Sequence, residues 1–362
     1  MRRLLLAPLL LLAACGGDKP GGANPWQAIA LGTDAAIRDL SFVDDQHGWM
    51  VGAAGGGEKG AVVGVTEDGG LTWRFRGGVV PPRYQAPSIA LNAVRFVTPR
   101  FGVAAGQSGT VLRSEDGGET WQQTLARGPV YSHWRDVDFV DLQHGWMIGR
   151  GGVIATEDTG ASWTRLDPPD APAEAGLALD MLDLDEGWMV GKHGLVLHST
   201  DGGRRWSPVN VLGALADGAV PDFAALHFVD RDHGWIAGTV TTARGIDDIH
   251  RAVLLHSADG GASWQSQLED VECILTAVRF ADARRGWALG FDRGAGTSTV
   301  LATADGGGSW DVELVVHGEE LAALEIGDAF VWAVGDRSRE EPQRLFRRAL
   351  DAPVVARSRR GR

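Results

Sequence analysis

Cysteine, tyrosine and positive charge are scarce in this chain. Its 362 residues include two cysteines, Cys15 and Cys273, and two tyrosines, Tyr84 and Tyr131. So few cysteines exclude a disulfide-rich scaffold, and no Cys/His cluster that could hold zinc is present. The 34 basic side chains fall to 32 once Arg2 and Arg3 are removed, against 47 acidic side chains. A body this acidic excludes nonspecific binding to nucleic acid.

A long apolar run is also missing. Leu4–Leu12 is too short to cross a bilayer as a permanent helix and follows a basic start, as in an export signal. Leu-Ala-Ala-Cys at residues 12–15 resembles a bacterial lipobox, so we expect residues 1–14 to be a signal peptide and Cys15 to carry lipid. An ordinary signal peptide cut nearby is the alternative. Residues 15–25 then form a flexible tether in the cell envelope, facing the periplasm, and Gly16 after the cysteine favours the outer membrane over the inner.

What the chain has in abundance is a repeat. The pattern Ser/Thr-x-Asp-x-Gly-x-x-Trp occurs six times, about every forty residues. That period is typical of the four-stranded blades of a β-propeller. The six aspartates of these Asp boxes are Asp68, Asp116, Asp158, Asp201, Asp259 and Asp305.

A second pattern precedes each Asp box. Phe-Val-Asp-x-x-His-Gly-Trp-x-x-Gly at residues 42–52 recurs, with weaker copies, to a total of seven. One outer strand is therefore missing, and Trp26–Leu31 matches the residues that follow the other Asp-box tryptophans. The sequence predicts an all-β fold, a seven-bladed propeller of four-stranded blades whose last blade is closed by the N-terminal strand. We expect one domain at residues 26–355, a basic disordered tail at 356–362, and a monomer.

The repeated residues have a structural interpretation. Aspartate oxygens accept backbone N–H bonds inside turns, glycines permit positive φ, and tryptophans fill the space between neighbouring sheets. Only Trp134 falls outside both motifs, at the start of an innermost strand, where we expect core packing. His47, His144 and His233 occupy equivalent turns of different blades, so they should be spread around the ring and not meet at a metal.

Charge is distributed unevenly between the two faces of the predicted ring. The Asp boxes and the acidic turns with Asp44, Asp141 and Asp230 belong to one face. Basic residues occupy connections of the opposite face, and we expect them to bind an acidic partner, although solvated loops with incidental arginines are the alternative. These basic residues are Arg83, Arg135, Arg150, Lys192, Arg244, Arg251, Arg293 and Arg337.

No catalytic centre can be assembled from the sequence. Sialidases carry similar Asp boxes, but their late tyrosine nucleophile has no counterpart here, because both tyrosines lie in the first blades. Phosphate-loop, nucleophile-elbow and dinucleotide motifs are missing too. Asp247, Asp248 and Asp292 could serve a glycosidase if they faced one another across a cleft. We expect no enzymatic activity, cofactor or metal.

Together, the two motifs, seven blades, one domain and a lipobox resemble the photosystem II stability and assembly factor family, lipoproteins built as seven-bladed Asp-box (BNR) propellers. The resemblance covers Trp26 to about Ala352. It implies a chaperone-like scaffold that binds newly made membrane-protein subunits through an arginine-rich patch, although no motif transfers that patch to particular residues here. The expected function is a non-enzymatic envelope scaffold or assembly factor with a membrane-protein partner. A carbohydrate-binding or carbohydrate-cleaving propeller is the alternative, and a passive structural lipoprotein is a third possibility.

Overall fold

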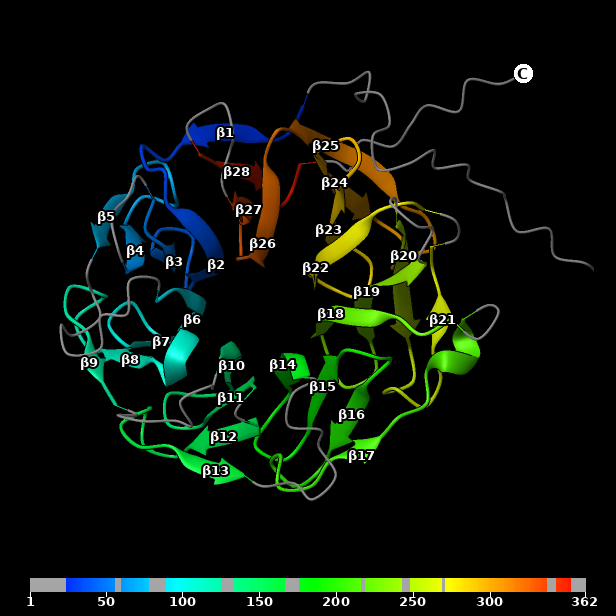
Figure 1. Ribbon diagram of the computed structural model, residues 1–362, viewed down its shortest axis with the longest axis horizontal. Coiled ribbons are helices and arrows are strands. Elements are labelled where there is room, and N and C mark those ends of the chain that lie inside the picture. Colours follow the sequence, from blue (N-terminus) through cyan, green and yellow to red (C-terminus); the bar gives the residue numbers. More distant parts are fainter. Residues whose placement is uncertain are drawn as a thin grey trace, which may run out of the picture.

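A ring of seven antiparallel sheets makes up the protein (Figure 1). The computed structural model describes residues 24–55, 60–77, 89–124, 133–150, 152–166, 176–215, 219–242, 248–268, 271–336 and 343–352. Cys15, the signal peptide and the basic tail lie outside these residues. No helix in the described part of the chain has the length and apolar character needed to cross a membrane.

Each sheet is one blade of four strands, named A to D from the channel outward. The A strands are β2 (Ala36–Phe42), β6 (Leu91–Phe96), β10 (Trp134–Phe139), β14 (Gly176–Met181), β18 (Asp222–Phe228), β22 (Ile274–Phe280) and β26 (Glu320–Ile326). The B strands are β3 (Gly48–Ala53), β7 (Gly102–Gly106), β11 (Gly145–Gly149), β15 (Gly187–Gly191), β19 (Gly234–Thr242), β23 (Gly286–Asp292) and β27 (Phe330–Asp336).

The outer strands complete the blades, which we number 1 to 7 in the order of their A strands. The C strands are β4 (Ala61–Thr66), β8 (Val111–Ser114), β12 (Gly152–Thr156), β16 (Val196–Ser199), β20 (Ile249–Ser257), β24 (Thr297–Thr303) and β28 (Arg344–Ala349). The D strands are β5 (Arg74–Gly77), β9 (Gln122–Gln123), β13 (Thr164–Leu166), β17 (Ser207–Pro208), β21 (Gln265–Ser266), β25 (Asp311–His317) and, for blade 7, β1 (Gln27–Ala30). Two short 3-10 helices, η2 (Gln107–Gly109) and η3 (Leu212–Ala214), lie in connections.

The predicted seven-bladed propeller and its N-terminal closure are confirmed. β1 pairs antiparallel with β28, from Gln27 opposite Arg347 to Ala30 opposite Arg344. The sheet order β1-β28-β27-β26 joins the two ends of the described chain in one blade. Because β1 pairs with β28, the edge of β28 is not left open to another chain.

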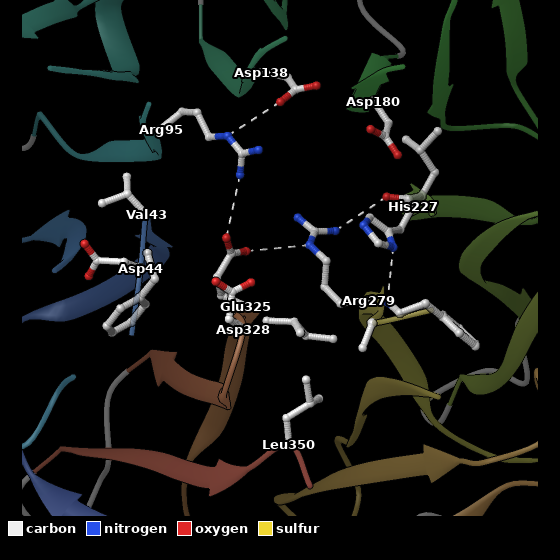
Figure 2. A pocket seen from close by; sticks show the side chains of 16 residues that line it. Val43, Asp44, Arg95, Asp138, Asp180, His227, Arg279, Glu325, Asp328 and Leu350 are labelled. Carbon is white, nitrogen blue, oxygen red and sulfur yellow. Dashed lines mark hydrogen bonds and ion pairs between the residues drawn. The ribbon is translucent and has the colours of Figure 1, made fainter. Parts of the chain in front are cut away.

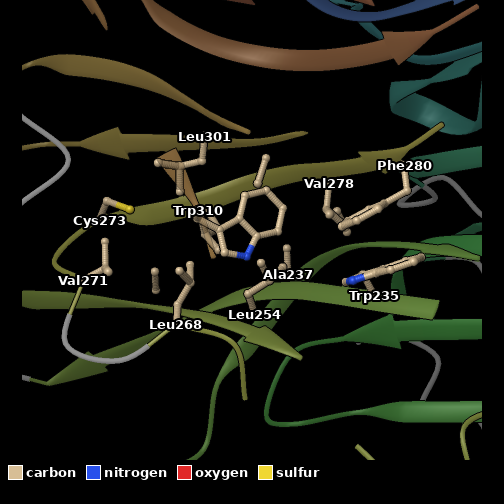
Figure 3. Packing of buried hydrophobic residues seen from close by; sticks show 14 of the residues in the cluster. Trp235, Ala237, Leu254, Leu268, Val271, Cys273, Val278, Phe280, Leu301 and Trp310 are labelled. Atoms are coloured by element: carbon tan, nitrogen blue, oxygen red, sulfur yellow. The ribbon is translucent and has the colours of Figure 1, made fainter. Parts of the chain in front are cut away.

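Neighbouring blades are held together by a repeated aromatic contact. The strand-B tryptophan of one blade stacks on the phenylalanine that ends strand A of the next blade. Trp235 stacks on Phe280 with ring centroids 3.5 Å apart, as seen in Figure 3, and Trp49 stacks on Phe96 at 3.6 Å. Glycine precedes the strand-B tryptophan in blades 1, 3, 4, 5 and 6, and at Gly234 a Cβ would overlap the Phe228 ring, whereas blade 7 carries Val331 at this position.

The same tryptophans also bond to the Asp box of the next blade. The indole Nε1 of Trp49 donates to the carbonyl oxygen of Gly117 at 2.8 Å, and Trp332 donates to Gly69 at 3.0 Å. Trp146 and Trp235 form the equivalent bonds at 2.9 and 3.2 Å. Stacking and this hydrogen bond therefore fix both the distance and the register between sheets.

Blade 7 has no Asp box, because its C and D strands come from opposite ends of the chain. A buried ion pair takes the place of the missing box. Glu313 accepts hydrogen bonds from Trp287 Nε1 and Trp26 Nε1, both at 3.0 Å, and pairs with Arg348 at 2.8 Å. Both charged side chains are 0% exposed. Removing one member of such a group would leave a buried charge or donor without its partner.

Inside each Asp box the carboxylate is used by the turn itself. Asp68 Oδ1 accepts from Thr72 N at 2.9 Å and from the Thr66 hydroxyl at 2.8 Å, and Oδ2 accepts from the Thr72 hydroxyl. These bonds hold the pKa of Asp68 below its usual value although partial burial opposes them. Asp201 lacks the second hydroxyl because Arg205 stands in the corresponding place, and its Oδ1 accepts from Arg205 N at 2.8 Å and from the Ser199 hydroxyl at 3.1 Å.

The two unassigned residues Trp134 and Cys273 both pack in the core. Trp134 is 1% exposed and lies among Val103, Val137 and Met147. Cys273 is 2% exposed beside Val271 and Leu268 (Figure 3).

Closure by β1 generates a stability prediction. Deleting residues 16–31 removes β1, exposes the edge of β28 and takes Trp26 away from Glu313, so the melting temperature should fall sharply. Loss of a buried tryptophan alone costs about 3–5 kcal/mol. Deleting only residues 16–23 is the matched control and should leave melting unchanged. Equal melting of the two truncated proteins would contradict the role of β1 in closure.

Candidate functional site

The central channel holds a ring of polar side chains, one from each A strand, all at the position before the terminal Phe, Met or Ile. Figure 2 shows six of them pointing into a cavity of about 480 Å³ that opens on the Asp-box face. The A-strand residues directly before and after each ring residue are apolar. Leu40 and Phe42, on either side of Ser41, pack against blade 7. The ring residues are Ser41, Arg95, Asp138, Asp180, His227, Arg279 and Glu325.

The acceptors in this ring bond to the next blade. Asp180 Oδ2 accepts from Phe228 N at 2.7 Å, and His227 Nδ1 accepts from Phe280 N at 3.1 Å. Ser41 and Asp138 accept in the same way from Phe96 and Met181. Because strand A is the inner edge of its sheet, these N–H groups have no strand to pair with, and the ring supplies their partners.

A second tier lies two residues deeper in the channel. Asp39 Oδ2 accepts from Val94 N at 2.8 Å, and Asp136 Oδ2 accepts from Leu179 N at 2.9 Å. Other blades carry alanine at this position, for example Ala93 and Ala225. Across both tiers, the carboxyl groups of the channel come from blades 1, 3, 4 and 7.

Two arginines interrupt the ring, since a guanidinium cannot accept a hydrogen bond. Arg95 lies 3.6 Å from both Asp138 and Glu325, and Arg279 lies 3.8 Å from Glu325 (Figure 2). Phe139 N, which Arg95 cannot serve, is bonded instead by Asp138 Oδ1 at 2.9 Å. The Arg95 side chain is still 39% exposed, so solvent reaches this level of the channel.

Burial shifts the protonation of the channel. It raises the pKa of Asp39 to about 8 and that of Asp180 to about 7, in the second case with help from the negative charge of Asp138. It likewise raises the pKa of Asp136 to about 6. Burial together with the charge of Arg279 lowers the pKa of His227 to about 3, so the imidazole is neutral and free to accept from Phe280.

The channel has no assembled reaction centre. Its carboxylates serve backbone N–H groups or arginines, the Ser41 hydroxyl accepts from Phe96 N, and among the described residues no cysteine or lysine lines the cavity. Within the described ranges, no group of three or more His, Cys, Asp or Glu side chains could hold a metal ion. The channel can therefore offer charge and hydrogen bonds to a ligand.

Five of the eight predicted basic residues are described, and all five side chains are exposed. Arg150, Lys192 and Arg293 follow the B strands, Arg251 is the third residue of strand C in blade 5, and Arg135 is in β10. Strand order places these B-to-C turns at the end of the ring opposite the Asp boxes. We call Arg135, Arg150, Lys192, Arg251 and Arg293 the cationic face. Arg83, Arg244 and Arg337 lie outside the described residues.

On the other face, the aspartates of the acidic turns accept hydrogen bonds from backbone N–H groups of their own turns. Asp44 Oδ1 accepts from Gln46 N at 2.8 Å and from His47 N at 2.7 Å, and its carboxylate also pairs with His47 Nδ1. Asp141 and Asp230 do the same for His144 and His233. Reversing these aspartates would therefore disturb the turns, which makes them poor control positions for a binding experiment.

The polar ring was missed in the sequence analysis. Its signal is present, because an Asp, Arg, His or Glu precedes the apolar residue that ends the A strand in six blades. Those positions look like the solvent side of an ordinary alternating strand, and only closure of the ring turns them toward a common axis.

The raised carboxyl pKa values generate a pH prediction. Between pH 6.5 and 8.5 the folded chain still binds protons at Asp39 and Asp180 that the unfolded chain has released, so the free energy of unfolding should fall as pH rises. One such proton gives a slope of up to about 1.4 kcal/mol per pH unit. The ordinary histidine pKa of 6.5 is at the lower end of this window, so the opposing contribution of His227 is largest there and fades as pH rises.

Asp39→Asn tests this assignment. The amide oxygen can still accept from Val94 N but does not ionise, so the slope of stability against pH should flatten in urea unfolding experiments. If the slope of unfolding free energy against pH is unchanged in the variant, Asp39 is not the group that binds this proton.

Comparison with known proteins places the chain in a family. The family model described as "Photosynthesis system II assembly factor YCF48" matches residues 21–128 and 124–218, more than half of the chain. The "Photosystem II assembly lipoprotein Ycf48" of a Synechococcus strain is 33% identical over 99 residues, 27% of each chain. The Thermosynechococcus vestitus protein is 49% identical over 53 residues, 15% of this chain and 14% of its own. The matches thus span about a quarter or less of these relatives.

Solved structures share the fold over nearly the whole chain. "YCF48 bound to D1 peptide" has a TM-score of 0.68 at 22% identity, covering 92% of this chain and 97% of that one. YCF48 from Cyanidioschyzon merolae has a TM-score of 0.67 at 19% identity, with coverages of 90% and 98%. A GH74 xyloglucanase from Xanthomonas campestris has a TM-score of 0.62 at 14% identity and is covered over only 55% of its length.

Fold, repeat pattern and family match agree. This chain belongs to the photosystem II assembly factor YCF48 family.

Proposed function

We propose that this protein is a non-enzymatic assembly scaffold of the cell envelope that binds a segment of a membrane protein. Family membership is the observation that carries the proposal. Curated relatives are named photosystem II assembly lipoproteins, and one solved relative is bound to a D1 peptide. We infer that the partner of this chain is likewise a membrane protein or a membrane-protein complex, presented as an extended segment.

The cationic face is the surface that we assign to the partner. The chain has a formal net charge of −13, yet Arg135, Arg150, Lys192, Arg251 and Arg293 all project from one end of the ring. Positive side chains concentrated on an acidic body create a directional field, which steers an acidic segment to that end and sets its orientation. Arg83, Arg244 and Arg337 belong to the same proposed surface by sequence position.

A glycosidase is less well supported by the described residues. Asp292 Oδ1 caps its own turn by accepting from Ala295 N at 2.9 Å, and the channel carboxylates are bonded to backbone N–H groups. The xyloglucanase similarity is a similarity of fold at 14% identity. Asp248 is exposed, and Asp247 lies outside the described residues. We therefore assign no catalytic residue, cofactor or metal to this protein.

Charge reversal tests the cationic face. The triple variant R150E/K192E/R251E should bind a D1 peptide, or the native membrane-protein partner once identified, at least tenfold more weakly in fluorescence anisotropy. The variant loses attraction to an acidic segment and gains repulsion, and both effects weaken binding. Because salt screens exposed charges, the difference in affinity between variant and parent should be smaller at 300 mM salt.

The control is R100E/R205E/R284E, which changes the net charge equally on the Asp-box face. Arg205 and Arg284 are exposed, and neither side chain makes a hydrogen bond or ion pair within the described residues. The proposal fails if both triple variants bind alike, or if the purified protein cleaves xyloglucan.

Lipid attachment at Cys15 is the proposed anchor, with the propeller facing the periplasm and the outer membrane favoured. A stable lipid anchor needs a second acyl chain or another membrane-binding signal. Such an anchor at Cys15 would hold the ring near its membrane partner. Cys15→Ala should move the protein from the membrane to the soluble fraction of fractionated cells. A Cys273→Ala variant is the matched control and should stay with the membrane. Membrane association that survives Cys15→Ala would contradict the anchor.

A further inference from the structure

A groove between blades 3 and 4 lies on the Asp-box face, away from the cationic face. It has a volume of about 580 Å³. Trp146 and Ala155 contribute to its floor together with Leu166, and Leu184 stands at the edge with 47% of its surface exposed. The groove therefore combines these four apolar side chains with polar ones such as Thr156 and Thr164.

In blades 4 and 5 a planar side chain of strand C covers the strand-B tryptophan. His198 stacks on Trp188 with centroids 4.1 Å apart, and His256 stacks on Trp235 at 4.7 Å. Each histidine is the cross-strand partner of the tryptophan that it covers. The covered tryptophans are 1% and 0% exposed.

In blade 6 an arginine covers the strand-B tryptophan. Trp287 stands opposite Ala302, which is too small to cover it, and the Arg348 guanidinium from blade 7 lies 5.1 Å from the Trp287 ring centroid. The chain thus places either an imidazole or a guanidinium over this indole face. Both groups are planar and can be cationic, which favours contact with the negative face of an indole.

Blade 3 lacks such a cover. Trp146 stands opposite Ala155, and within the described residues no aromatic ring or guanidinium stacks on Trp146. Trp146 keeps 4% exposure, more than its counterparts in blades 4 and 5. The groove occupies the place that His198 and His256 fill in the blades that follow.

The edge of the groove is negatively charged. Glu157, Asp158 and Asp185 line it, against one arginine, Arg204. Glu157 is 76% exposed and lies 3.8 Å from Arg204, whereas the exposed Asp185 carboxylate makes no hydrogen bond or ion pair within the described residues. A cation entering the groove would therefore meet an indole face and an uncommitted carboxylate.

We propose that this groove is a second docking site, which takes an arginine side chain of a partner polypeptide. The guanidinium stacks on Trp146 in the position that His198 and His256 hold elsewhere, and it pairs with Asp185 and Glu157. Leu166 and Leu184 contact apolar residues beside that arginine. The site goes beyond the proposed function, because it selects a basic segment where the cationic face selects an acidic one.

Binding of a short labelled peptide tests the site. A fluorescein-labelled peptide with a central Leu-Arg-Leu sequence is titrated with the full-length chain in detergent at low salt, and anisotropy should saturate at one site. Replacing the arginine by citrulline keeps its shape and removes its charge, so affinity should fall about tenfold. Absence of saturation up to millimolar protein, or equal binding of the citrulline peptide, would overturn the proposal.

Ala155→His fills the groove from within, as the histidines do in blades 4 and 5. This variant should bind the peptide at least tenfold more weakly than the parent, while its melting temperature stays the same or rises. Ala262→His places the same side chain on an exposed turn of blade 5 and is the matched control, with unchanged binding expected. Equal binding by the parent and Ala155→His contradicts the location.

Neutralising the carboxylates at the edge of the groove provides a second readout that does not alter packing. Glu157→Gln with Asp185→Asn should weaken binding several-fold and reduce its dependence on salt, because the paired carboxylates are gone. Unchanged affinity and salt dependence would contradict the role of these carboxylates. Both readouts are independent of the cationic face, so their failure would leave the proposed function standing.

Discussion

The inner edge of each sheet is the constraint on which the rest of this structure depends. Strand A lines the channel, so alternate backbone N–H groups on its free side have no strand to pair with, and leaving them unbonded would be costly. The protein meets this need with side chains of the preceding blade, such as Asp39 for Val94 and Asp180 for Phe228. Polar residues must therefore face the axis of the ring, and a channel rich in carboxyl groups is the consequence.

This solution has an electrostatic cost that the channel compensates internally. Burial, reinforced by the negative charge of neighbouring carboxylates, disfavours ionisation, which explains the raised pKa of Asp39 and Asp180. Arg95 and Arg279 sit where acceptors would otherwise stand and share Glu325 between them. The channel is thus first a structural element, and the two ends of the ring are left to meet partners.

Between the blades, a single tryptophan position carries much of the packing. Its indole stacks on the next blade, donates to the next Asp box and, in blades 4 and 5, is covered by a histidine of its own sheet. Where the cover is missing at Trp146, a groove forms; where the Asp box is missing in blade 7, the buried pair of Glu313 and Arg348 replaces it. Deviations from the repeat therefore mark the places where this chain differs from a generic propeller.

The sequence by itself determined the fold, because turn-forming aspartates, glycines and tryptophans act locally and recur with the period of a blade. It also determined the closure, since Trp26–Leu31 matches the missing outer strand. Only the tertiary structure decided that Asp39, Asp180 and His227 meet around one axis and that no ring or guanidinium of the described residues stacks on Trp146 beside Ala155. Those contacts join residues from different blades, dozens of positions apart, whose spacing along the chain carries no record of which side chain will face which.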